Sequence, residues 1–207
     1  MKKNILFIAL ALVLLMAVPA HSGNGLYVGG NIGLSMMRDV DTDYFVVPVN
    51  FKFEPGYALG AVVGYGHNYF RGEAELMYQK SNLDKADITG FGEVGASGDV
   101  SNLAFLLNGY FDIKNPSIVT PYLTAGIGVS RVDVDSIKIL GLPITTKKSY
   151  DDTVFAYQVG AGVGFDVTKN ITIDLKYRYF GTSDVKIDSE KFTNASHNIY
   201  LGMRYSF

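Results

Sequence analysis

Histidine and serine are the residue types in this chain that could carry acid–base or nucleophilic catalysis. The chain has 207 residues and three histidines, of which His197 directly follows Ser196. Neighbouring residues in a β-strand point to opposite faces, so these two side chains cannot act together as base and nucleophile. His67 stands beside Asn68 in a predicted turn, where a solvated histidine is expected. Because the chain also contains no cysteine, thiolate and zinc–thiolate chemistry are excluded, and we expect a protein that is not an enzyme.

Two further patterns could in principle hold a cofactor or a metal ion. The run Gly160–Gly164 is rich in glycine, but no predicted helix follows it to present an amino terminus to a phosphate. Asp133 with Asp135, and Asp151 with Asp152, lack the spacing of a calcium-binding loop. We therefore expect a strand and solvated loop charges here, with no cofactor and no metal.

Two charged triplets are the most informative polar pattern in the chain. The first triplet is Arg71, Glu73 and Glu75, and the second is Asp174, Lys176 and Arg178. Within each triplet the charged residues are spaced two apart, so in a strand their side chains share one face. We predict that the triplets, together with Arg204, form a network of ion pairs inside a barrel. The expected network sets Arg71, Lys176, Arg178 and Arg204 against Glu73, Glu75 and Asp174.

The composition favours a β-sheet protein that does not bind nucleic acid. Lys and Arg number 18 against 20 Asp and Glu, so a net charge of −2 provides no basic field for a polyanion. Hydrophobic residues make up 48% of the chain, which excludes a disordered protein. The 23 glycines and the 13% of aromatic residues favour sheet over helix.

Hydrophobic and polar residues alternate strictly through most of the chain, which predicts strands. We expect eight strands, each close to the 9 to 11 residues that cross a bilayer when tilted. Their expected ranges are Leu26–Ser35, Tyr57–Gly66, Phe70–Gln79, Val100–Phe111, Tyr122–Ser130, Phe155–Phe165, Ile171–Tyr179 and Ser196–Phe207.

The expected connections alternate between long and short. Short turns are predicted at His67–Asn68 and Asp166–Asn170, and one of intermediate length at Asp112–Thr120. The long polar connections are Met37–Pro55, Lys80–Asp99, Arg131–Asp152 and Gly181–Ala195. This pattern predicts an eight-stranded antiparallel up-and-down transmembrane β-barrel with short periplasmic turns and long outer loops. In the third long connection the alternation continues, so we expect β-structure to rise above the membrane there.

The amino-terminal segment has the composition of a secretory signal peptide. Lys2 and Lys3 precede the uncharged segment Ile5–Ala20, which small residues follow. A membrane-spanning helix would need about 20 apolar residues. We therefore expect residues 1–22 to be a signal peptide, cleaved after Ala20 or Ser22, and residues 23–207 to form the barrel domain.

The two faces of the predicted strands decide the environment of the barrel. One face carries aliphatic residues with Tyr and Phe toward its ends, and the other carries glycine, amides and the charged triplets. An arginine facing lipid at the bilayer midplane costs about 2 to 4 kcal/mol, so the charged face must line the lumen. An aliphatic outer wall would not be tolerated in water. We therefore expect the protein in the outer membrane of a Gram-negative bacterium.

The chain resembles the small outer-membrane β-barrel family that includes the OmpA transmembrane domain, OmpX and the opacity-type surface antigens. The resemblance spans the whole mature chain. The matching segments are Leu26–Gly30, Arg71–Glu75, Asn108–Asp112, Pro121–Tyr122 with Gly126–Gly128, Tyr157–Gly162 and Tyr205–Phe207. By this resemblance Tyr205 and the terminal Phe207 form the signal read by the outer-membrane assembly machinery, and periplasmic chaperones are further expected partners.

These patterns lead to one functional expectation and two alternatives. We expect a non-enzymatic barrel whose long loops pack with lipopolysaccharide, adhere to a surface ligand or are displayed as antigens, because binding residues concentrate in loops on rigid scaffolds. The first alternative is a narrow porin or transporter for ions or small solutes. The second is an outer-membrane enzyme that modifies lipid and depends on His197.

Overall fold

The alternating segments form one closed sheet in the computed structural model, which describes residues 25–38, 40–42, 49–88, 92–139, 150–183, 185–187, 190–192 and 195–207. The predicted signal peptide, residues 1–22, lies outside the described residues, so its cleavage remains a prediction. The strands are β1 (Gly25–Met37), β2 (Val40–Thr42), β3 (Val49–Phe53), β4 (Gly56–His67), β5 (Phe70–Ile88), β6 (Gly92–Asp112), β7 (Val119–Ile139), β8 (Tyr150–Asp166), β9 (Ile171–Thr182), β10 (Val185–Ile187), β11 (Glu190–Phe192) and β12 (Ala195–Ser206).

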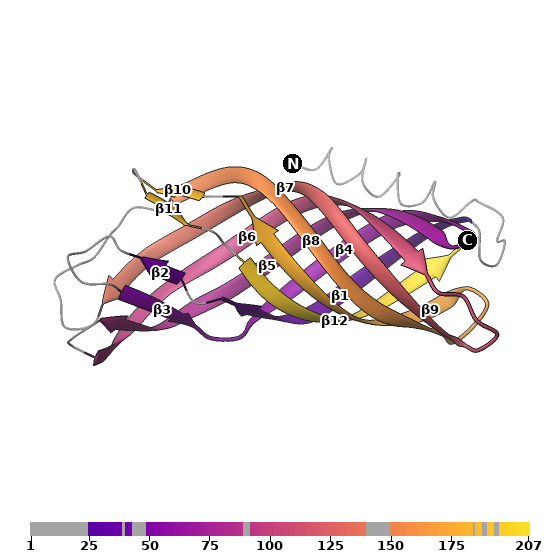
Figure 1. Ribbon diagram of the computed structural model, residues 1–207, viewed down its shortest axis with the longest axis horizontal. Helices are drawn as coiled ribbons and strands as arrows, with labels where there is room; N and C mark the ends of the chain where they lie inside the picture. The colour runs from indigo at the N-terminus through magenta and orange to yellow at the C-terminus, as the bar shows by residue number, and fades with distance from the viewer. Residues whose placement is uncertain are drawn as a thin grey trace, which may run out of the picture.

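Eight of these strands form the predicted barrel. They lie in the order β5-β4-β1-β12-β9-β8-β7-β6, and the pairing of β5 with β6 closes the sheet. Every neighbouring pair is antiparallel, including the first and last barrel strands, which pair from Tyr27 opposite Ser206 to Met37 opposite Ser196. The expected eight-stranded antiparallel barrel is confirmed (Figure 1). Within the described residues, no helix is long and apolar enough to cross a membrane.

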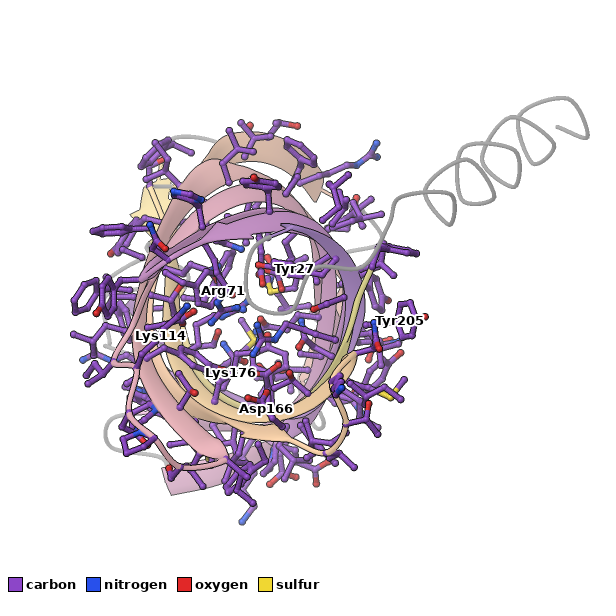
Figure 2. The ribbon with its side chains drawn as sticks, turned by 90° about the vertical axis from the view of Figure 1, so that its right-hand side faces the viewer. Tyr27, Arg71, Lys114, Asp166, Lys176 and Tyr205 are labelled. Atoms are coloured by element: carbon purple, nitrogen blue, oxygen red, sulfur yellow. The ribbon has the colours of Figure 1, made fainter. Side chains whose placement is uncertain are left out.

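The outer wall of the barrel is apolar and its interior is polar and aromatic, as predicted. Large aliphatic side chains point away from the axis, and Ile32, Leu107 and Ile127 are 65%, 58% and 59% exposed. The alternate residues are buried in the lumen and include amides and ionised groups. Figure 2 looks into the barrel from the end that carries the carboxyl terminus and shows Arg71 and Lys176 pointing inward and Tyr205 pointing outward.

Close cross-strand contacts between tyrosine and glycine shape the lumen. Tyr27 lies directly opposite Gly64, and Tyr200 lies opposite Gly33. A Cβ atom at either glycine would collide with the facing tyrosine ring, so only glycine lets the ring lie against the neighbouring strand. These pairs explain much of the glycine on the inner face, because each small residue makes room for a large one beside it.

The prediction of a loop at Lys80–Asp99 is wrong for most of these residues. β5 continues to Ile88 and β6 begins at Gly92, and the two strands pair throughout this extension apart from a bulge near Asp84. Residues 81–88 are mostly polar, and Leu83 is a buried exception, so the hydrophobic alternation that marks a strand is weak here while the pairing continues. In the third connection β7 runs to Ile139, which confirms the β-structure expected there.

The two walls of the barrel therefore differ in height. β6 and β7 have 21 residues each, whereas β4, β9 and β12 have 12. β3 pairs with the outer part of β5, beyond the end of β4, and β2 pairs with β3. The result is a sheet that rises from one side of the barrel, seen at the left of Figure 1. We call the outer parts of four barrel strands, together with β2 and β3, the raised wall. These outer parts are the residues of β5 after Lys80, of β6 before Ser101, of β7 after Arg131 and of β8 before Thr153.

Candidate functional site

The lumen near the short-turn end holds Arg71 between two rings and two carboxylates. Its Nε and Nη2 atoms donate to the Asp112 carboxylate at 2.8 and 2.9 Å, and its Nη1 lies 3.4 Å from Glu73. The guanidinium carbon lies 4.2 Å from the centre of the Tyr110 ring and 4.9 Å from that of Tyr122. This bidentate and stacked geometry suits arginine and would not suit lysine.

Asp112 is a functional side chain that the sequence analysis missed. It was expected to begin a turn, but it is the last residue of β6 and is buried against Arg71. The signal was present in the alternation, because Asn108, Tyr110 and Asp112 are spaced two apart and share the inner face.

A second ion pair lies across the lumen from Arg71, near the same short-turn end. Arg204 of β12 donates to the two oxygens of Asp174 on β9 at 2.6 and 3.1 Å. Gly202, not Arg204, is the direct cross-strand neighbour of Asp174, so the pair is diagonal. Asp174 is buried and Arg204 is half-buried, which leaves this pair closer to water than the others.

The middle of the lumen contains a fully buried ion pair. Nη1 of Arg178 donates to both oxygens of Glu75, at 2.9 and 3.0 Å, and both side chains are 0% exposed. Asn108 also donates to Glu75, at 2.7 Å, and Gln158 donates to it at 3.3 Å. The Glu75 carboxylate of β5 therefore accepts hydrogen bonds from β6, β8 and β9, which ties four strands together.

Lys176 is the member of the predicted network that stands apart. Its side chain is buried, yet it makes no ion pair or hydrogen bond within the part of the chain that the structure describes. Its nearest aromatic neighbours are the rings of Tyr110 and Tyr200, whose centres lie 6.0 and 5.9 Å from Nζ. The structure thus places all seven predicted charges in the lumen, six of them in three pairs.

An apolar layer lies above the charged groups, toward the long-loop end. Its members are all 0% exposed, and the hydroxyl of Tyr200 donates to the sulfur of Met77 at 3.3 Å. The layer consists of Ala58, Met77, Ala104, Leu106, Ala156, Phe180 and Tyr200. We predicted a network of ion pairs in the lumen and did not predict this layer. Packed apolar side chains of this kind leave little room for water.

His197 and Ser196 lie on opposite faces of β12. The hydroxyl of Tyr177 and Nδ1 of His197 share a hydrogen bond of 2.6 Å on the outer wall. Ser196 is fully buried in the lumen, where its hydroxyl donates to Gln79 at 3.4 Å. The expectation that the two cannot act as base and nucleophile is confirmed. Among the described residues, no group of three or more His, Asp or Glu side chains could hold a metal ion.

Charged residues face outward just above the outer aromatic residues. Lys80, two positions beyond Tyr78, pairs with Asp99 at 3.0 Å, and Arg131 pairs with Asp133 at 3.3 Å. The hydrogen bond to Asp99 and its negative charge raise the pKa of Lys80 above its ordinary value. These exposed pairs mark the level at which the wall leaves the hydrocarbon.

Comparison with known proteins identifies relatives across almost the whole chain. The model of a family described as outer membrane protein beta-barrel domain matches residues 6–207. Outer membrane protein PagN of Salmonella typhimurium is 26% identical over 95% of each chain. The 22 kDa outer membrane protein of Rhizobium leguminosarum bv. viciae is 30% identical over 91% of this chain and 80% of the relative.

A solved structure supports the same fold. The crystal structure of Neisserial surface protein A superposes with a TM-score of 0.60 and 22% identity, covering 88% of this chain and 97% of that protein. At this identity the likeness concerns the fold alone. The resemblance inferred from the sequence segments is confirmed by the family model and by these relatives.

Proposed function

This chain belongs to the outer membrane protein beta-barrel domain family and lies in the outer membrane of a Gram-negative bacterium, and we propose that it is a non-conducting, non-enzymatic scaffold that displays an adhesive surface. In barrels of this kind short turns face the periplasm and long connections face outward. The raised wall and the connections around it then project from the cell. We propose that they make the contact with a surface ligand.

The observation that carries this proposal is the unequal height of the barrel walls. A strand needs about 9 to 11 residues to cross a bilayer, and β6 and β7 each have 21. Turns at the periplasmic end are short, since β4 and β5 are joined by Asn68 and Tyr69 alone. The surplus residues therefore stand outside the membrane, as a paired sheet that holds its shape better than a flexible loop.

The interior of the barrel supports a scaffold rather than a channel. The buried pair of Arg178 with Glu75 links β9 to β5 across the lumen, the other two buried pairs link neighbouring strands, and the apolar layer lies beyond them toward the outside. Such a network rigidifies a barrel when its members are satisfied. A rigid base keeps the raised wall in one orientation, which reduces the entropy cost of binding.

Shortening the raised wall tests the adhesive role. Asn82 of β5 lies directly opposite Asp99 of β6, so a two-residue Asn-Gly turn can replace residues 83–98 without changing the barrel register. Cells that display the full chain should bind epithelial cells or matrix-coated surfaces, and cells with the shortened chain should lose most of this binding. Binding that neither this shortening nor the second one described below reduces would contradict the proposal.

A second shortening serves as the matched comparison. Val132 of β7 lies opposite Asp152 of β8, so residues 133–151 can be replaced in the same way. The mobility of unheated and heated samples on gels checks that both shortened barrels fold. Loss of binding in one variant and retention in the other would locate the contact on one hairpin.

The two alternative functions have direct tests. Steady single-channel conductance in a planar bilayer, changed by Glu73→Gln, would favour a narrow pore over the proposed scaffold. A change in lipid A structure on expression that disappears with His197→Ala would favour an enzyme. We expect neither, because the apolar layer crosses the lumen and His197 is hydrogen-bonded to Tyr177 on the outer wall.

A further inference from the structure

The outer wall of the barrel has a groove that faces the membrane. It is open, has a volume of about 310 Å³ and lies across β6, β7 and β8. Leu107, Ile127 and Val159 form its apolar sides, Ala125 lies between them, and Tyr157 stands at one end. Because this wall contacts lipid, the molecules that can reach the groove carry hydrocarbon chains.

Ala125, which lines the groove, is smaller than the apolar side chains Leu107, Ile127 and Val159 around it. Ala125 of β7 lies opposite Gly109 of β6, and both point toward the membrane between larger neighbours. A Cβ atom placed on Gly109 would meet only the carbonyl oxygen of Ala125, at 3.9 Å. Packing within the barrel therefore does not require glycine at this position, unlike Gly64 or Gly33, which face tyrosine rings.

A platform of four rings adjoins the groove at its outer end. Tyr157 lines the groove and also contacts Tyr179, with ring centres 6.4 Å apart. His197 contacts Tyr179 at 5.3 Å and Tyr177 at 6.0 Å, and it is hydrogen-bonded to the Tyr177 hydroxyl. These rings lie on β8, β9 and β12 at the level where aromatic residues meet lipid headgroups. Their faces suit a sugar ring, and their polar atoms suit hydroxyl groups.

The position of the Tyr157 ring is fixed by the backbone beside it. Gly181 of β9 is the direct cross-strand partner of Tyr157, and a Cβ there would lie 2.7 Å from the phenol carbon and oxygen. The ring is therefore held over the backbone of β9, between the groove and the other rings. A preformed surface of this kind binds with little ordering cost.

A cation stands above the groove on the same face. Arg131 follows Ile127 by four residues along β7, so both side chains point outward. Its guanidinium is exposed and pairs with Asp133 at 3.3 Å. Exposed pairs of this type contribute little to stability, so a phosphate could compete for the guanidinium.

From these three features we propose that this face binds one lipopolysaccharide molecule from the outer leaflet. An acyl chain lies in the groove, the phosphorylated sugar headgroup rests on the ring platform, and a headgroup phosphate pairs with Arg131. This lipid site lies on the membrane-facing wall, and it does not depend on the adhesive role proposed for the raised wall.

Lipid retention by the purified protein tests this site. The protein is extracted in a mild detergent, delipidated, mixed with purified lipopolysaccharide and examined by native mass spectrometry. Ala125→Leu fills the groove, and Arg131→Gln removes the cation. We expect Arg131→Gln to lower the affinity for lipopolysaccharide about fivefold, since a basic residue near an anionic surface has an effect of this size. Ala125→Leu should lower the affinity at least as much, because the acyl chain can then no longer enter the groove.

Matched controls separate the site from general effects on the barrel. Ala61→Leu makes the same change at an exposed position on β4, and Lys114→Gln removes a cation from the turn between β6 and β7 at the periplasmic end. Both controls should bind lipopolysaccharide as the unchanged chain does. Gel mobility before and after heating confirms folding, and Arg131→Gln alone decides the question if Ala125→Leu does not fold.

Several outcomes would overturn the proposal. One is equal lipopolysaccharide binding by Ala125→Leu, Arg131→Gln and the unchanged chain. Another is a preference for phospholipid over lipopolysaccharide, which would make the groove a general acyl-chain contact. A third is a dimer mass that Ala125→Leu abolishes, which would make a second copy of the chain the occupant.

Discussion

The two halves of the lumen are held together by different interactions. From the periplasmic end to its middle, the lumen contains ion pairs and tyrosine rings around Arg71, Arg204 and Arg178, whereas the outer half contains the apolar layer around Leu106 and Phe180 beside buried amides such as Gln79. An ion pair is selective, because each charge costs free energy if its partner is removed. Apolar packing is less selective but excludes water. The barrel thus combines ion pairs that fix the strand positions with an apolar layer packed beside them.

The largest expected effect comes from breaking the central pair in the charged half. Arg178→Ala leaves the fully buried Glu75 carboxylate without its guanidinium and should lower the free energy of unfolding by about 3 to 5 kcal/mol. Urea titration in detergent, with folded protein followed by heat-dependent gel mobility, measures this change. An unchanged transition would show that the pair does not hold the lumen together.

The double variant Glu75→Leu with Arg178→Met is the control for that experiment. Replacing both members of a buried ion pair with apolar residues is often neutral or stabilising. We expect the double variant to recover most of the stability lost in Arg178→Ala. A double variant as unstable as Arg178→Ala would indicate that Asn108 and Gln158, which also donate to Glu75, need the carboxylate.

The next largest effect is expected in the apolar half. Leu106→Ala removes a fully buried side chain from the layer and should lower the free energy of unfolding by about 2 to 5 kcal/mol through the cavity it leaves. Leu107→Ala, the neighbouring outward residue, is the matched control, because lipid can fill the space it leaves. The comparison fails if both variants lose the same stability in the urea titration.

The charged half was predictable from the sequence and the apolar half was not. Arg71, Glu73 and Glu75 could not face lipid, so their spacing assigned one face of the strand to the lumen. Phe180 and Leu106 carry no such constraint, because an apolar side chain is acceptable on either face of a membrane barrel. The partners within the charged half also depended on strand register, which no single strand reveals.

The raised wall shows a second limit of prediction from sequence. The membrane-crossing part of β5 was found because lipid on one face and charge on the other enforce alternation. Beyond Lys80 the residues are mostly polar, although Leu83 is buried, so the continuation to Ile88 shows little hydrophobic alternation and was expected to be a loop. The β-structure of β7 was foreseen because its outer part keeps the alternation.

A smaller effect should follow from removing one hydrogen bond at the base. Tyr27 donates to the buried Glu73 carboxylate at 2.8 Å, and hydrogen bonds to charged groups contribute about 1.5 to 3 kcal/mol. Tyr27→Phe keeps the ring over Gly64 and removes only the hydroxyl, so the loss in the urea titration should fall in this range. Tyr205→Phe, an outward-facing tyrosine near the carboxyl terminus, is the control and should change stability less.

The smallest effect is expected at Lys176, and it separates two explanations of the charged half. Lys176 is buried beside the paired charges but makes no ion pair within the described chain, so Lys176→Met removes a charge without breaking a direct contact. If direct pairs hold the base together, Lys176→Met should leave the urea midpoint close to that of the unchanged chain, because methionine fills similar space and needs no solvation. If the balance of all lumen charges matters instead, the midpoint should fall toward that of Arg178→Ala, since Glu73, Glu75 and Asp174 would then face one fewer cation. We expect the first result, because each of these three carboxylates already has an arginine within 3.4 Å.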